Sequence, residues 1–164
     1  MSIAIMAAGA LVFVLACIGV GILIANTPQT SEIEQGVAPN APDFPAVLPA
    51  NKKIDSLGGW QKLISPDGET FYVFLDTLDG VPIKVSQQEL PATLKDDIDS
   101  SIAEVAMGYN ATDTLTANGT KAYIGTSAKG PQSVIFARNN VLVLIVSEQK
   151  IQDESWITYI SSLK

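Results

Sequence analysis

The sequence predicts an α+β domain, an antiparallel sheet of about six to seven strands with two helices packed on one face, preceded by a single N-terminal transmembrane helix. Three observations support this prediction. An uncharged apolar stretch opens the chain, strand-like runs separated by hairpin-type turns fill much of the remainder, and two segments have helical periodicity. The 164 residues leave room for one globular domain beside the apolar stretch.

The apolar stretch covers residues 3–25 and contains no charged residue and no proline. At about 1.5 Å per residue, a helix of this length rises about 34 Å, enough to cross a hydrocarbon core of about 30 Å. A cleaved signal peptide is the main alternative, but it has a basic n-region, a shorter apolar core and a small residue three positions before the cut. No Lys or Arg precedes this stretch, and Leu23 stands at that position. We therefore expect an uncleaved single-pass anchor in the cell membrane over residues 1–25.

The charges around the anchor predict its orientation. Its first C-terminal bases, Lys52 and Lys53, lie outside the window of roughly 15 to 20 residues that sets topology. We therefore expect a cytoplasmic N-terminus and an extracytoplasmic C-terminal domain. A stripe of small residues also allows weak self-association of two such helices. Its members are Gly9, Cys17, Gly21 and Ala25.

Residues 26–50 hold five prolines, three acids and no base, without apolar periodicity. This composition predicts an extended linker, which leaves residues 51–164 as the folded extracytoplasmic domain. That domain carries all ten bases and fourteen acids, a net charge of −4. The acidic balance opposes binding to nucleic acid or to an anionic lipid surface.

Hairpin signals divide the domain into strands. Each contains Asp, Asn or Gly where a positive φ is required. They are "SPDGE" at 65–69, "LDGV" at 78–81, "ANGT" at 117–120 and "RNNV" at 138–141. The run "VLVLIVS" at 141–147 is apolar on both faces, which predicts a central strand.

Two helices interrupt and end the series. We expect Thr93 to cap the first helix and a second helix to follow Asp153. Apolar residues recur at helical spacing in both. In the first these are Leu94, Ile98, Ile102, Val105 and Tyr109, and in the second Trp156, Ile157, Ile160 and Leu163. The predicted order is three strands, a helix, three or four strands and a terminal helix.

The stretch "IGTSAKGPQS" at 124–133 has the glycine spacing of a phosphate-binding loop. Such a loop needs Lys and Ser or Thr directly after its second glycine, followed by a helix. Gly130 is instead followed by Pro131, Gln132 and a strand-like run. The stretch therefore predicts a turn between two strands and no nucleotide site.

Residue composition excludes several kinds of catalysis. The chain has no histidine, and its one cysteine lies in the predicted anchor, so a Ser-His-Asp triad, an imidazole metal site and thiol catalysis are absent. The adjacent Asp96 and Asp97 are interpreted as an acidic first helical turn. We predict no catalytic residue, no metal and no cofactor.

Two polar segments are the candidate contact sites for a ligand or partner, with an ordinary sheet edge and turn as the alternatives. The first lies where the third strand runs out, and the second is the loop that contains the two glycines. Together they comprise Ser86, Gln87, Gln88, Thr126, Ser127, Lys129 and Gln132. Asn110 and Asn118 match the N-glycosylation pattern, although turn chemistry also explains Asn118.

The segments "GGWQKL", "VSQQELP" and "GTKAYIGTSAKGPQSVIFARNNVLVLIVS" with the ending "WITYISSLK" resemble a family of uncharacterised single-pass envelope proteins of small-genome, host-dependent bacteria. The ending is more distantly similar to the C-terminal domain of unknown function of membrane-bound anti-sigma and sporulation-type proteins. The resemblance implies an extracytoplasmic sheet domain with a terminal helix, and it transfers no catalytic residue.

Two hypotheses of function follow. The first is a non-enzymatic envelope module that binds a protein, peptide or glycan. The second is a hydrolase or transferase that uses carboxylates or Ser127 with Lys129, which requires a desolvated lysine as general base. We favour the binding module, because Lys129 lies in a predicted loop between Ala128 and Gly130.

Overall fold

The computed structural model of the chain describes residues 41–66 and 68–164. The predicted anchor, its orientation, its stripe of small residues and most of the predicted linker lie outside the described residues. Neither helix of the described part of the chain combines the length and the apolar character that crossing a membrane requires.

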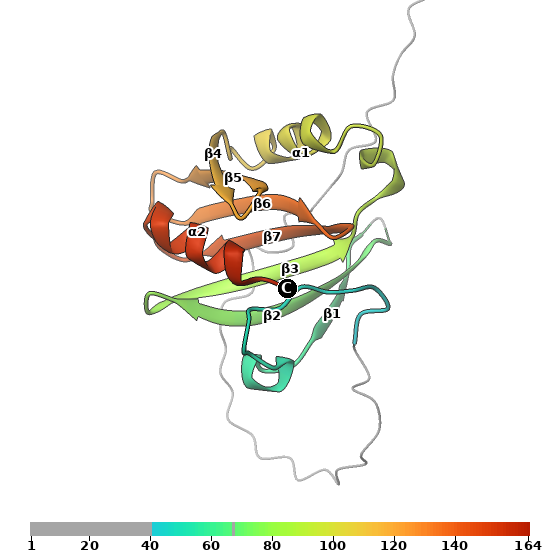
Figure 1. Cartoon of the computed structure of the whole chain (residues 1–164), viewed down its shortest axis with the longest axis horizontal. Coiled ribbons are helices and arrows are strands. Elements are labelled where there is room, and N and C mark those ends of the chain that lie inside the picture. Colours follow the sequence, from blue (N-terminus) through green and yellow to red (C-terminus); the bar gives the residue numbers. More distant parts are fainter. Residues whose placement is uncertain (1–40, 67) are drawn as a thin grey trace, which may run out of the picture.

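A seven-stranded antiparallel sheet forms the centre of the fold, in the order β1-β2-β3-β7-β6-β5-β4 (Figure 1). Its strands are β1 (Gln61–Ile64), β2 (Thr70–Leu78), β3 (Val81–Glu89), β4 (Asp113–Ala117), β5 (Thr120–Thr126), β6 (Gln132–Arg138) and β7 (Val141–Ser147). Two meanders, β1 to β3 and β4 to β7, join where β3 pairs with β7. The predicted α+β class and the order of three strands, a helix, four strands and a helix are confirmed.

The tight turns lie where the sequence predicts them. Positive φ at both central residues suits the right-handed twist of the strands that such a turn joins. The β2–β3, β4–β5 and β6–β7 turns have this geometry at Asp79-Gly80, Asn118-Gly119 and Asn139-Asn140, with φ between 49° and 79°. Local turn chemistry therefore selects which strands are hairpin neighbours.

Strand β7 is the middle strand of the sheet, as its apolar run predicts. All residues from Val141 to Ile145 are buried. Alternate side chains enter two different cores, with Val143 in one and Leu144 in the other. Both faces of the central strand therefore need a cover.

The two helices provide that cover from opposite faces of the sheet, so the predicted packing on one face is wrong. In α2 (Asp153–Ser162), Trp156 packs in the same core as Phe136 of β6. In α1 (Ile98–Met107), Ile102 packs in the same core as Ile135. Because neighbouring residues of a strand point to opposite faces, the fold has three layers. Placing both helices on one face would expose Ile135 and Leu144 to water.

The first helix begins later than predicted. Thr93 lies in a short 3₁₀ turn, η3 (Ala92–Leu94), and α1 starts after Asp97. The Asp97 Oδ1 atom accepts a hydrogen bond from the Ser100 N–H at 3.2 Å. Asp97 is therefore the N-cap of α1, because its carboxylate satisfies a free N–H of the first turn.

The folded domain begins before residue 51, the boundary expected from the prolines. Val47 is only 1% exposed and belongs to the core that contains Trp156 of α2. Leu48 forms two backbone hydrogen bonds with Lys164, at 3.0 and 2.9 Å. The last residues of the predicted linker are thus part of the domain, because they cover apolar surface and pair with the C-terminus.

Gly125 in β5 permits a close crossing of the chain. A Cβ atom at this position would lie 2.3 Å from the Asn110 carbonyl oxygen and 2.8 Å from the Ala111 Cα atom. The chain leaving α1 therefore passes directly over β5 at Gly125. This packing explains the first glycine of the loop-like motif without a phosphate.

Candidate functional site

The first predicted contact segment does not lie at the surface. Ser86, Gln87 and Gln88 are buried in β3, at 2%, 0% and 5% exposure. Strand β3 is paired on both sides, with β2 and with β7. The predicted sheet-edge lip is therefore wrong at these residues, because β7 of the second meander pairs along the side of β3 that would otherwise be an edge.

Gln87 holds the chain entering the domain. Its Oε1 atom accepts a hydrogen bond from the Val47 N–H at 2.8 Å, and its Nε2 atom donates to the Val47 carbonyl at 2.7 Å. The side-chain amide thus pairs with a backbone unit as a neighbouring strand would. We call this pair of hydrogen bonds the Gln87 clamp, and its role is structural.

Gln132, the last residue of the second predicted segment, also has an internal role. Its Oε1 atom accepts hydrogen bonds from the Ile151 N–H at 2.7 Å and the Trp156 indole N–H at 3.0 Å. Its Nε2 atom donates to the Thr126 hydroxyl at 3.0 Å. Gln132 is buried and joins β6 to the start of α2, so it does not face a ligand.

The other members of the second segment are exposed: Thr126 ends β5, and Ser127 and Lys129 lie in the turn between β5 and β6. The Ser127 N–H donates to the Pro131 carbonyl at 2.8 Å, and the turn leads into β6 and not into a helix. The exclusion of a phosphate-binding loop thus has a structural basis, and contact with a partner stays a prediction for these three residues. Lys129 lacks the desolvation that the hydrolase alternative requires.

The structure contains a groove that the sequence did not predict. It has a volume of about 430 Å³ and lies between the start of α1 and the β4–β5 and β6–β7 turns. We call it the α1 groove. Its lining includes Ile98, Asp99, Asn118, Lys121, Tyr123 and Asn139. Three segments that are distant in the sequence form this groove, so the sequence could not predict it. Of its parts, the sequence predicted the hairpin turns at 117–120 and 138–141.

Lys121 and Asp99 place opposite charges in the α1 groove. The Lys121 Nζ atom lies 4.9 Å from the centre of the Tyr123 ring, and the Tyr123 hydroxyl donates to the Asp99 carbonyl oxygen at 3.3 Å. The Tyr123 side chain, and to a smaller extent the Asp99 carboxylate, raise the pKa of Lys121. Lys121 is therefore a cation at neutral pH and is not poised to act as a general base.

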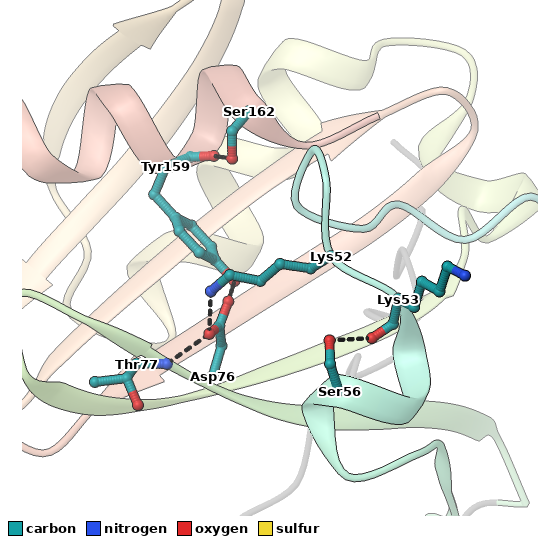
Figure 2. Close-up of polar contacts among 7 residues, drawn as sticks. All are labelled: Lys52, Lys53, Ser56, Asp76, Thr77, Tyr159 and Ser162. Atoms are coloured by element: carbon teal, nitrogen blue, oxygen red, sulfur yellow. Dashed lines mark hydrogen bonds and ion pairs between the residues drawn. The ribbon is translucent and has the colours of Figure 1, made fainter.

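A second polar cluster joins β2, α2 and the entering chain (Figure 2). Asp76 accepts hydrogen bonds from the Lys52 ammonium at 2.6 Å and the Thr77 N–H at 2.7 Å through Oδ1, and from the Tyr159 hydroxyl at 3.1 Å through Oδ2. Burial, followed by the charge of Asp76, raises the pKa of Tyr159 well above its ordinary value. Both carboxylate oxygens are engaged, so the cluster is a structural junction.

The described residues contain no group of three or more Cys, Asp or Glu side chains placed to hold a metal ion. Of the adjacent Asp96 and Asp97, the latter caps α1 through its side chain. Both residues precede α1, and the acidic residue of its first turn is Asp99, so the predicted acidic first turn does not lie at Asp96 and Asp97.

Comparison of the chain with protein-family models, with curated proteins and with solved structures finds no match. The resemblance to single-pass envelope proteins thus rests on the quoted sequence segments alone. The function has to be inferred from the site.

Proposed function

We propose that this chain is a membrane-anchored extracytoplasmic binding module of the cell envelope, which holds a protein, peptide or glycan partner and does not catalyse a reaction. Residues 3–25 support the anchor, because their length and apolar character suit a single span. The proline-rich segment that follows would hold the domain away from the bilayer. The domain itself begins by residue 47, where the Gln87 clamp holds the chain.

The α1 groove is the observation that supports a binding function. It brings together a cation, a carboxylate and two side-chain amides beside apolar residues of α1, so several polar groups converge on one concave surface. The raised pKa of Lys121 favours its role as a cationic contact and not as a general base. We therefore place the binding surface at the α1 groove in preference to the predicted segment at residues 86–88.

Protease treatment of intact cells tests the topology. If the anchor is uncleaved with its N-terminus inside, external protease removes the chain from about residue 26 onward and leaves residues 1–25 in the membrane. A mature protein that begins near Asn26 would show that the stretch is a cleaved signal.

Site-specific photocrosslinking in native membranes tests the binding surface. A photoreactive residue replaces Thr120 in the α1 groove in one variant and the exposed Ser127 of the β5–β6 turn in another. We expect a discrete adduct at Thr120 only. An adduct only at Ser127 would move the surface to the turn predicted from the sequence, and absence of adducts at both positions would contradict the binding function.

A further inference from the structure

We infer that the α1 groove binds a neutral, hydroxyl-rich saccharide unit. This inference rests on the proposed binding function and adds the chemical class of the ligand. Its volume of about 430 Å³ lies within the usual range of small-ligand sites, about 300–1,000 Å³.

The charges of the groove favour a neutral ligand. Lys121 and Asp99 both line it, so an anion would meet the Asp99 carboxylate and a cation would meet the Lys121 ammonium. Arg138 also lies along the groove, but its guanidinium donates to the Ile160 carbonyl of α2 at 2.8 Å. This interaction engages the guanidinium away from the groove, so Arg138 does not add a second cationic contact there.

The hydrogen-bonding groups of the groove suit hydroxyls. Asn118 and Asn139 are exposed at the tips of two hairpin turns, and both line the groove. Each amide offers both a donor and an acceptor, which matches a hydroxyl group that also does both. The Asp99 carboxylate adds acceptors for further hydroxyls.

Apolar residues complete the match. Ile98 is 41% exposed although it is large and apolar, and it lines the groove together with Ile102 and Ala137. A sugar ring has an apolar C–H face besides its polar rim, so it can cover Ile98 while its hydroxyls reach the two amides. An N-acetyl substituent would add one amide and one methyl group to these contacts.

The test uses the full chain in phospholipid nanodiscs and the N-acetylglucosamine tetramer as probe. We expect saturable binding by isothermal titration calorimetry. The variant Asn118→Gly with Asn139→Gly should bind at least tenfold more weakly and keep its fold, because glycine adopts the positive φ of both turns. Asp99→Ala should also weaken binding. The matched control Lys150→Gln alters an exposed residue outside the groove lining and should bind as the wild type does.

The possible failures are distinguishable. Absence of tetramer binding, or equal binding by the wild type and the glycine variant, overturns the saccharide inference. Binding of inorganic phosphate that depends on Lys121 overturns the neutral-ligand argument but leaves the groove as a binding surface. Only absence of a crosslink at both Thr120 and Ser127 would contradict the proposed function.

Discussion

Replacement of Gln87 by leucine tests whether the Gln87 clamp fixes the start of the domain. The change removes the side-chain amide that pairs with the buried Val47 backbone, so both the N–H and the carbonyl of Val47 lose their partners. Each buried polar group left without a partner costs about 1–3 kcal/mol, so the two together cost about 2–6 kcal/mol. The leucine side chain has similar bulk and restores about 1–2 kcal/mol of apolar burial. The midpoints of these two ranges differ by about 2.5 kcal/mol, so we expect Gln87→Leu to lower the free energy of unfolding by about that amount.

Urea denaturation of a fragment of residues 41–164 measures this loss. With a urea dependence of about 1–2 kcal/mol/M, the midpoint should fall by about 1–3 M. Gln61→Leu is the matched control, because Gln61 is exposed in β1 and its replacement should change stability by no more than about 0.5 kcal/mol.

A shorter fragment of residues 51–164 isolates the clamp from other effects of the leucine. It lacks Val47, so the Gln87 amide has already lost its two partners, and Gln87→Leu should be neutral or stabilising there. An equal loss in both fragments would refute the reasoning. If the shorter fragment does not fold, hydrogen exchange of the Val47 amide is measured in the longer fragment instead. A Val47 N–H that stays protected from exchange in Gln87→Leu would also refute the role of the clamp.

Three further predictions concern the rest of the fold. Gly125→Ala should lower the free energy of unfolding by about 1–3 kcal/mol, because the new Cβ meets the Asn110 backbone; an unchanged thermal melt would contradict this crossing. Tyr159 has a raised pKa, so the unfolded chain loses this proton first and wild-type stability should fall above about pH 10 by at most about 1.4 kcal/mol per pH unit. Tyr159→Phe should lack that part of the alkaline decline, and an identical pH profile for both proteins would count against the buried hydroxyl. Wild-type protein and Lys129→Ala should both show no ATP binding by calorimetry with or without Mg²⁺, and micromolar affinity would contradict the reading of residues 124–133 as a turn.

The sequence determined the strands and their hairpin order, because these depend on neighbours in the chain. Asn118-Gly119 and Asn139-Asn140 adopt positive φ readily, so each turn reverses the chain where these residues occur. The unbroken apolar run at 141–147 needs burial on both faces, which only an interior strand provides. The turns and the central strand could therefore be predicted from the backbone preferences of the turn residues and from the pattern of apolar side chains along the strand.

The tertiary structure decided which polar residues face water. Gln87 and Gln132 have the composition of surface residues, yet their partners are Val47, 40 residues away, and Trp156, 24 residues away. A polar side chain reveals only that it needs a hydrogen-bonding partner, and water and a distant backbone group satisfy it equally well.

The same limit applies to the helices and to the α1 groove. Helical periodicity gave α1 and α2 an apolar side each, but the sheet face that each covers depends on how β3 and β7 meet, since that pairing joins the two meanders. The groove needs Ile98, Asn118 and Asn139 at one end of the sheet, a proximity created only when three separate segments pack. Local preferences act over a few residues, whereas burial and proximity depend on the whole chain, and for that reason the sequence determined the elements and the tertiary structure decided the site.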